Sequence, residues 1–210
     1  MPPAATAPLA PLPGRRLRKR EETADRLVDT AFALFSAHGY EAVTMEQIAA
    51  AADVAKGTLY NYFPVKEALL SHRLHADLSA ALPGLFADLA ALPGRIDRLR
   101  AFLHASAAYN ERARDYLAPY LHYRLSRPVD TLGRDHRSGL DQIYARLLAD
   151  AQAAGEIRQE LPVQRLADYL AFMHLGTLLR WLRTPEASLA AEFDAMLDLF
   201  IDGARAGKQP

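Results

Sequence analysis

The chain has 210 residues, 50% of them hydrophobic, and its 25 basic and 25 acidic side chains give a formal net charge of zero. This length allows one large domain or a small domain joined to a larger one, with enough apolar residues for a core. The absence of cysteine excludes disulfides and a thiol nucleophile. The zero net charge argues against a protein that coats nucleic acid through bulk charge.

The N-terminal segment joins a proline-rich stretch to a basic cluster. Five cations follow MPPAATAPLAPLPG, namely Arg15, Arg16, Arg18, Lys19 and Arg20. Proline disfavours helix and strand, and a signal peptide has the opposite order of cations and apolar residues. No uncharged apolar window of about 18 residues predicts a membrane span. We therefore expect residues 1–20 to be a flexible basic arm on a cytoplasmic protein without membrane partners.

Three helical patterns follow this arm. Apolar residues recur every three or four positions from Glu21 to His38, at Ala24, Leu27, Ala31, Leu34 and Phe35, and Gly39 ends the pattern. Thr44 and Gln47 have the spacing of a capping box and begin a short second helix, with Met45, Ile48, Ala49 and Ala52 facing inward. These two helices and the segment that comes next indicate a helix-turn-helix.

The third pattern, AKGTLYNYF at residues 55–63, has one buried face and one polar, aromatic face. Leu59 and Phe63 are four residues apart and share the buried face, so the polar side chains point elsewhere. Thr and Tyr contact phosphates or thymine methyls, Asn binds base edges, and glycine permits close approach of the backbone. Lys56 and Lys66 are suited to neutralise phosphates. A second helix entering the major groove would use all of these groups together.

The remaining chain predicts further helices and no alternating strand pattern. A helix begins at Pro64, and others are expected over about 95–112, 114–125, 134–153, 163–183 and 184–205. Thr184 and Pro185 are expected to start the last of these. LPG at 82–84 and at 92–94 should each break or kink a helix. The fold class is therefore all-α.

Residues 39–70, GYEAVTMEQIAAAADVAKGTLYNYFPVKEALL, resemble the DNA-binding domain of the TetR family of transcriptional regulators, with LF at 34–35 in the preceding helix. LLADAQAAGEIR at 147–158 is similar to the family's regulatory half, though less distinctively. The resemblance implies an N-terminal three-helix DNA-binding domain at 21–66. It also implies a larger helical ligand-binding and dimerisation domain at 67–210.

The resemblance also implies roles for individual residues. Thr44 would contact phosphate, Tyr62 and Lys66 would bind the DNA backbone, and the groove would be faced by Lys56, Gly57, Thr58, Tyr60 and Asn61. Family members often carry serine or threonine where this chain has Ala55, so a cap and a phosphate contact are missing unless Asp53 caps instead. The basic cluster at 15–20 would reach into a minor groove or along phosphates. The alternatives are that the tyrosines pack between helices, that Thr44 only caps its helix, and that the basic arm only keeps the terminus soluble.

A pocket for a small-molecule effector is expected in the C-terminal half. One helical face carries Tyr116, Tyr120 and Tyr123 with Arg124 beside them, and the preceding helix offers Phe102, Ser106 and Tyr109. An apolar wall with hydroxyls and one cation suits an aromatic or acidic molecule, although a tyrosine stripe also suits plain packing. His72 and His75 lack a supporting metal signature, so neither a metal nor a cofactor is expected.

The two terminal helices are rich in apolar residues. One stripe comprises Leu189, Phe193, Met196, Leu197 and Phe200, and the helix before it carries Leu170, Met173, Leu178, Leu179 and Leu182. This much apolar surface predicts a homodimer, and the resemblance implies that these helices form its four-helix bundle.

The leading hypothesis is a dimeric repressor that a small-molecule effector releases from a palindromic double-stranded DNA operator. The alternatives are a ligand-independent or partner-controlled regulator, or an activator. An enzyme is disfavoured because no nucleophile elbow, phosphate loop or metal-ligand spacing occurs in the sequence.

Overall fold

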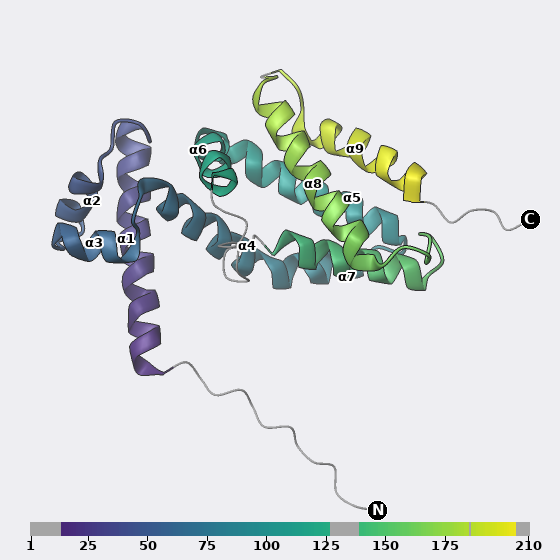
Figure 1. Cartoon of the computed structure of the whole chain (residues 1–210), viewed down its shortest axis with the longest axis horizontal. Coiled ribbons are helices and arrows are strands. Elements are labelled where there is room, and N and C mark those ends of the chain that lie inside the picture. Colours follow the sequence, from purple (N-terminus) through teal and green to yellow (C-terminus); the bar gives the residue numbers. More distant parts are fainter. Residues whose placement is uncertain (1–13, 127–138, 185, 205–210) are drawn as a thin grey trace, which may run out of the picture. The chain divides into compact units, whose positions relative to one another are not determined.

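The computed structural model describes residues 14–126, 139–184 and 186–204, which form helices joined by turns and short loops, without strands (Figure 1). The helices are α1 (Arg15–His38), α2 (Met45–Ala51), α3 (Lys56–Tyr62), α4 (Lys66–Ala90), α5 (Arg95–Arg112), α6 (Arg114–Leu125), α7 (Leu140–Ala153), α8 (Val163–Leu182) and α9 (Leu189–Ala204). The all-α prediction is confirmed. Residues 1–13 of the expected arm and residues 134–138 of the expected seventh helix lie outside the described residues.

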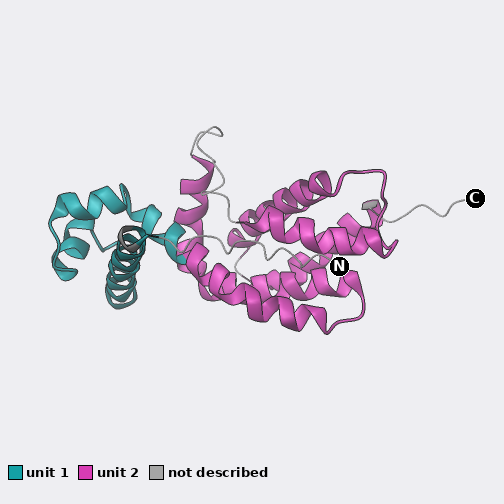
Figure 2. Cartoon of the chain, turned by 90° about the horizontal axis from the view of Figure 1, so that it is seen from below, with its two compact units in different colours: residues 1–73 teal, residues 74–210 magenta. Residues whose placement is uncertain are grey.

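The chain divides into two compact units, residues 1–73 and 74–210, here called the N-terminal unit and the C-terminal unit (Figure 2). The boundary falls inside α4, seven residues beyond the expected boundary at 66. Helix α1 begins at Arg15, so residues 15–20 belong to the helix and not to the arm in which they were expected. This segment, RRLRKR, contains good helix formers and no proline, and the helix therefore extends through it.

The core of the N-terminal unit is apolar and small. Leu27, Ile48 and Leu59 contribute one residue from each of the three helices, and none of them has exposed surface. Ring contacts add to this core, because Phe35 lies edge-on to Tyr40 with 5.0 Å between centroids. The inward faces predicted for α1 and α2 are buried as expected, except for half-buried Leu34.

Helix α4 runs through the first LPG sequence, and Pro83 lies inside it. Proline removes one backbone donor and crowds the preceding turn, which is why a break or kink was predicted there. The helix nevertheless continues to Ala90, and further along it Leu89 is buried and Phe86 packs under the Arg146 guanidinium at 4.0 Å. Only the second LPG, at 92–94, lies between helices.

The C-terminal unit is built around α5, α7, α8 and α9. Helix α7 packs along α8, and α5 packs along α9 (Figure 1). Trp181 is 2% exposed, donates its indole N–H to the Ala187 carbonyl oxygen at 2.8 Å and lies 4.1 Å from the Arg114 guanidinium. Trp181 therefore belongs to the core of this unit.

Helix α9 differs from the prediction in its start and in its buried face. It begins at Leu189, because Thr184 donates its hydroxyl to the Arg180 carbonyl at the end of α8, whereas Ser188 accepts from Ala191 N–H. The stripe expected to pair with a second subunit is buried within one chain, and it includes Phe193, which has no exposed surface. Among the described residues, no helix is sufficiently long and apolar to cross a membrane.

Candidate nucleic-acid interface and buried polar cluster

Helix α3 has the two-sided character that its sequence predicts. Leu59 and Phe63 are 0% and 5% exposed, respectively, whereas Tyr60 is 37% exposed. The remaining residues named for the groove or the DNA backbone lie at the surface or are half-buried, namely Lys56, Gly57, Thr58, Asn61 and Tyr62. A Cβ added to Gly57 would meet nothing within 4 Å, so this backbone is open to close approach. The surface formed by residues 56–62 is called the recognition face below.

The helix starts around this face differ in their capping. Thr44 and Gln47 form the predicted capping box, because Thr44 Oγ1 accepts from Gln47 N–H at 3.2 Å and Gln47 Oε1 accepts from Thr44 N–H at 2.8 Å. Helix α3 begins after Ala55 without a side-chain cap. Asp53 does not replace it, and instead adopts a left-handed backbone with φ of +52° in the turn between α2 and α3.

Lys56 is not an isolated cation, because it forms an ion pair with Glu46 on α2. The hydrogen bond between them lowers the pKa of Glu46 and raises that of Lys56. Lys56 Nζ also lies 5.8 Å from the centre of the Tyr60 ring. Glu46 was not among the residues predicted from the sequence, since nothing in the sequence pattern pairs it with the recognition helix.

Lys66 is held within its own unit. Its Nζ donates to the carbonyl oxygens of Tyr40 and Val43 at 2.7 and 2.9 Å, and it lies 4.1 Å from the centre of the Tyr40 ring. These contacts join the start of α4 to the loop between α1 and α2. The predicted contact between Lys66 and the DNA backbone therefore competes with a structural role and stays a prediction.

The basic start of α1 lies beside the recognition face. The Arg20 guanidinium lies 5.9 Å from the centre of the Tyr62 ring, at the far end of α3 from Lys56. Arg18 and Lys19, next to it in sequence, are exposed. Cations on α1 thus lie next to the Tyr62 end of the recognition face, within the basic cluster that the sequence placed at 15–20.

The residues proposed for an effector pocket fall into different environments. Phe102 belongs to the core, with its ring 5.5 Å from that of Tyr144. Ser106 accepts from the Asn110 side-chain amide at 3.1 Å, and Tyr109 donates its hydroxyl to Asp77 at 2.8 Å. Two other candidates, Tyr116 and Tyr123, are half-buried on α6.

Tyr120 and Arg124 come together as predicted. Arg124 donates to the Tyr120 hydroxyl at 3.2 Å, and that hydroxyl lies 3.5 Å from His75 Nε2. Tyr120 is 6% exposed, and burial raises the pKa of its hydroxyl. Among the residues that the structure describes, no carboxylate lies within ion-pair distance of the half-buried Arg124 guanidinium.

A second polar pair, Tyr144 and His174, is buried in the same unit. The Tyr144 hydroxyl lies 2.7 Å from His174 Nδ1, and these residues are 0% and 4% exposed. Burial, and secondly the positive charge of Arg124, lower the pKa of His174 to about 3, so its imidazole is neutral near pH 7. We call Tyr120, Arg124, His75, Tyr144 and His174 the buried polar cluster, in which Arg124 and His75 are half-buried. The sequence analysis identified only the first two as site residues, because the others lie on three different helices.

Within the described parts of the chain, no group of three His, Cys, Asp or Glu side chains is arranged to hold a metal ion. His72 instead lies 2.7 Å from Asp25 of α1, and Arg73 donates to Asp29 of α1 at 3.3 Å. These two contacts attach the first turns of α4 to α1.

Two family models match the sequence. The model of the tetR family of bacterial regulatory proteins matches residues 27–72. The model of the C-terminal domain of TetR/AcrR family transcriptional repressors matches residues 86–203, more than half of the chain.

Individual relatives agree with these matches. The chain is 30% identical over 200 residues to the HTH-type transcriptional repressor KstR of Rhodococcus jostii, with 89% of this chain and 86% of KstR covered. The crystal structure of Thermus thermophilus FadR, a TetR family repressor in complex with lauroyl-CoA, superposes with a TM-score of 0.76 at 29% identity, covering 89% of this chain and 98% of FadR. Bacillus subtilis FadR in complex with stearoyl-CoA has a TM-score of 0.67 at 18% identity, covering 86% and 99%, and shows the shared fold alone.

Proposed function

Because the chain belongs to the TetR family of bacterial transcriptional regulators, we propose that it is a dimeric repressor released from its operator when a small molecule binds the C-terminal unit. The observation that carries this proposal is the recognition face. There, Leu59 anchors α3 in the core while Tyr60 and Asn61 remain accessible. The assigned role is regulatory and not catalytic, and binding to chromosomal DNA implies a cytoplasmic protein.

On DNA, α3 would enter the major groove. Asn61 is suited to bind a base edge, and Tyr60 and Thr58 are suited to contact phosphates or thymine methyls. Tyr62 lies at the end of α3, and the guanidinium of Arg20 on α1 lies beside its ring. Both side chains would contact the backbone of the duplex. The cap residue Thr44 would add a phosphate contact at the start of α2.

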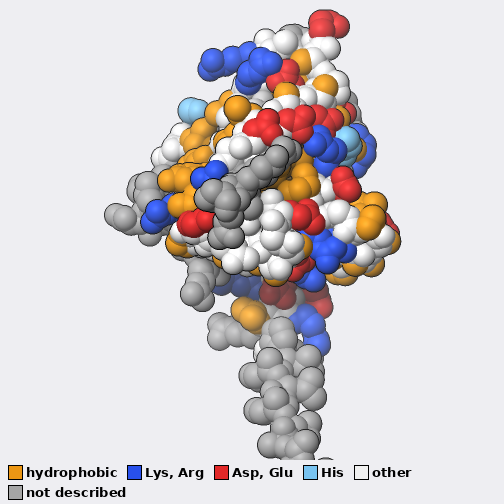
Figure 3. All heavy atoms as spheres, turned by 90° about the vertical axis from the view of Figure 1, so that its right-hand side faces the viewer, with side chains coloured by type: hydrophobic (Ala, Val, Ile, Leu, Met, Phe, Trp, Pro, Cys, Tyr) orange, Lys and Arg blue, Asp and Glu red, His pale blue; other side chains and the backbone are white. Residues whose placement is uncertain are grey.

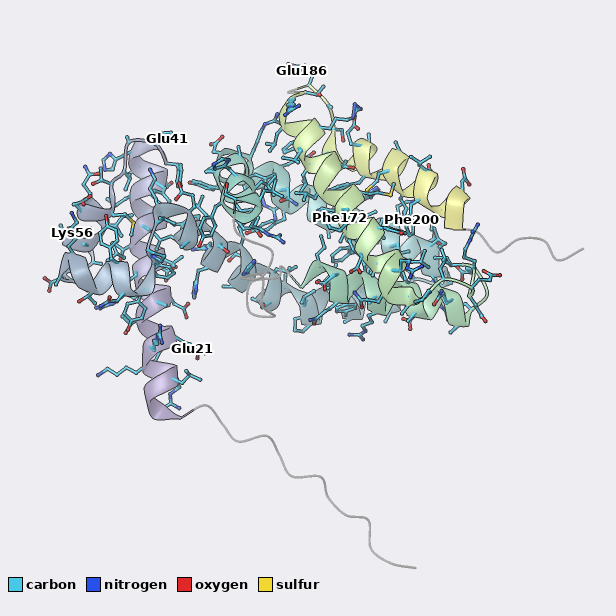
Figure 4. All side chains as sticks on the ribbon, in the orientation of Figure 1. Glu21, Glu41, Lys56, Phe172, Glu186 and Phe200 are labelled. Atoms are coloured by element: carbon cyan, nitrogen blue, oxygen red, sulfur yellow. The ribbon has the colours of Figure 1, made fainter. Side chains whose placement is uncertain are left out.

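Dimerisation would use a face that the single chain leaves uncovered. Helix α8 exposes Tyr169, Phe172 and Leu179, with exposed fractions of 55%, 72% and 36%. Open Gly176 lies between them, and the spacing of three and four residues gives one continuous stripe. Leu199 on α9 is 70% exposed. Figure 4 labels Phe172 on α8 and Phe200 on α9, of which only Phe200 is buried. Figure 3 shows apolar side chains among charged ones on one face of the molecule.

A dimer brings two recognition faces to one operator. Two recognition helices about 34 Å apart read half-sites one helical turn apart on a palindromic operator. Truncating the stripe by Phe172→Ala should therefore weaken operator binding by lowering the dimer fraction, while Phe200→Ala should instead destabilise the C-terminal unit. Sedimentation equilibrium separates these two effects.

Release would require the effector to prefer one of two conformations. An affinity difference worth about 1–3 kcal/mol is typical of such coupling. His72 and Arg73 at the start of α4 are paired with Asp25 and Asp29 on α1, so a shift of these turns would move α1 with them. Helix α4 is therefore the element through which we expect the effector to act.

We propose that the effector is an anionic molecule with an apolar part, and that Arg124 binds its charge. The guanidinium has a neutral partner in Tyr120, and the neutral His174 and Tyr144 lie in the same cluster. A half-buried cation is stabilised by an anion that replaces its lost hydration. Acyl-CoA esters are the first class to test, since the 29% identical Thermus FadR binds lauroyl-CoA.

The test is fluorescence anisotropy with labelled duplexes from the upstream region of the protein's own gene, at several salt concentrations. We expect preference for one palindromic duplex and its loss on adding an acyl-CoA ester but not free coenzyme A. Arg124→Met should weaken the ester's effect, and Arg112→Met, which removes an exposed cation of α5, should not. Preference for a duplex that no ester changes would favour the ligand-independent or partner-controlled alternative, and absence of any preference would contradict the repressor function.

A further inference from the structure

Glu46 places a negative charge on a surface that is expected to contact the phosphates of DNA. It lies in the first turn of α2, is exposed, and forms the ion pair with Lys56 in the first turn of α3. Lys56 Nζ lies 5.8 Å from the Tyr60 ring, and the Tyr60 side chain also contributes to lowering the pKa of Glu46. One carboxylate thus contacts or neighbours two residues of the recognition face.

This arrangement does not serve the stability of the fold in an obvious way. The side chains of Lys56 and Glu46 are 60% and 52% exposed, and ion pairs this open to water contribute little to stability. The turn between α2 and α3 is already held by the buried Leu59 and Ile48 and by the hydrogen bond from Val54 N–H to the Ala49 carbonyl at 3.0 Å. A carboxylate on a DNA-binding face therefore needs another explanation.

We propose that Glu46 is a specificity-determining residue that suppresses binding to non-operator DNA. While Glu46 holds Lys56, the lysine contributes no net charge to the indiscriminate attraction of phosphates. The carboxylate also repels any duplex that offers it no donor, whereas a cytosine N4 amino group in the operator can donate to it. Selectivity then arises from a penalty on wrong sequences, which is a common way to discriminate between similar partners.

The proposal rests on the DNA-binding function proposed above and makes a separate prediction. Glu46→Gln keeps the shape of the side chain and removes its charge, leaving Lys56 free for phosphate. We expect affinity for random duplex DNA to rise about tenfold at low salt, and the slope of log K against log salt to become more negative by about 0.9, the value of one added phosphate contact. Operator affinity should rise less, so the ratio of operator to random affinity falls.

Two variants control this experiment. Glu41→Gln removes the same charge from an exposed position of the loop between α1 and α2, and Figure 4 labels Glu41 and Lys56 at different elements of the N-terminal unit. It should change the salt slope less than Glu46→Gln. In a Lys56→Gln background, Glu46→Gln should no longer steepen the slope, because the cation that it would release is absent.

The outcomes separate the two proposals. If the wild-type protein prefers its operator but Glu46→Gln leaves the affinity ratio unchanged, or lowers operator affinity without raising random affinity, the role assigned to Glu46 is wrong and the repressor function stands. If the wild-type protein prefers no duplex, the repressor function itself fails. Circular dichroism melting of each variant checks that the fold is retained.

Discussion

In the N-terminal unit the Tyr60 side chain is 37% exposed beside an ion pair, whereas in the C-terminal unit Tyr144 has no exposed surface and lies against a buried histidine. The first unit keeps an apolar core and places its polar groups outside, where a partner can reach them. The second unit has several polar groups inside, where each costs free energy unless it is paired. Contact with a macromolecule suits the first arrangement, and enclosure of a small molecule suits the second.

This difference also explains why the site of the N-terminal unit is easier to predict from the sequence than that of the C-terminal unit. A surface helix on an apolar core shows an apolar periodicity of three and four, and the remaining positions show what the exposed face carries. A buried polar pair such as Tyr144 and His174 joins residues thirty positions apart on different helices, with no periodic signal between them.

The largest effect that tests this comparison is a loss of core in the N-terminal unit. Leu59→Ala should destabilise that unit by about 2–5 kcal/mol, because the side chain is fully buried and leaves a cavity. Trp181, the single tryptophan, reports on the C-terminal unit. We therefore expect urea unfolding followed by circular dichroism to shift while the tryptophan fluorescence transition stays in place.

Asn61→Ala is the matched control on the exposed side of the same helix. It should change stability by less than about 0.5 kcal/mol and still weaken operator binding. A large loss of stability in this variant would mean that the two faces of α3 are not separated as the exposures indicate.

A smaller effect is expected at Lys66, which is predicted to contact the DNA backbone and also holds the N-terminal unit together. Lys66→Met removes the donors to the Tyr40 and Val43 carbonyl oxygens and should cost about 1–3 kcal/mol in the free energy of unfolding. If Lys66 acts through structure, operator affinity falls without a change in the salt slope. A slope less negative by about 1 would instead support the phosphate contact predicted from sequence.

The buried histidine predicts a pH dependence for the C-terminal unit. The pKa of His174 is about 3 when folded, below the value of about 6.5 for an unfolded histidine, so the unfolded chain binds more protons between these values. The contribution of neutral His174 to stability is therefore fully present above about pH 6.5. Below that value the free energy of unfolding falls by about 1.4 kcal/mol for each pH unit, down to the folded pKa.

The measurement is urea unfolding followed by Trp181 fluorescence at about pH 7.5 and about pH 5.5. His174→Gln should be less stable than the wild type near neutral pH but should lose much of the dependence on pH. His122→Gln removes an exposed imidazole from the same unit and serves as the control. An unchanged pH dependence in His174→Gln would contradict the assignment to the buried pair.

The smallest expected effect is a gain of stability in the N-terminal unit. Asp53 has a φ of +52°, which glycine adopts without steric cost, so Asp53→Gly should stabilise that unit by up to about 1 kcal/mol. Ala51→Gly, two residues earlier at the last position of α2, should instead cost up to about 1 kcal/mol. A loss of stability in Asp53→Gly would show that the aspartate side chain contributes more than its backbone strain costs.

Much of the fold was predictable from the chain because its local signals are strong. The bounds of α5 and α6 agree with the prediction, and the capping box at Thr44 is present as expected. The differences from prediction arose where local signals compete with longer-range contacts. Pro83 does not break α4, one of the two outcomes predicted for it, and the apolar stripe of α9 that contains Phe193 is covered by its own chain.

The candidate site divides in the same way. The polar face of α3 was predictable because Leu59 and Phe63 fix which side is buried. The partners of that face were not predictable, since Glu46 and Arg20 reach it from other helices. The pairing of Lys66 with backbone carbonyls was also not predictable, because every residue has a backbone carbonyl and the sequence does not show which one accepts.

The sequence by itself determined the all-α class, the helix-turn-helix and the face that the recognition helix presents, because these depend on periodicity and capping within a few residues. Only the tertiary structure decided which cations remain available to DNA, which apolar stripe stays exposed for a partner, and which polar groups are buried together. The physical reason is that charge pairing and burial depend on groups brought together from distant positions, and their free energies change with the surroundings that packing creates.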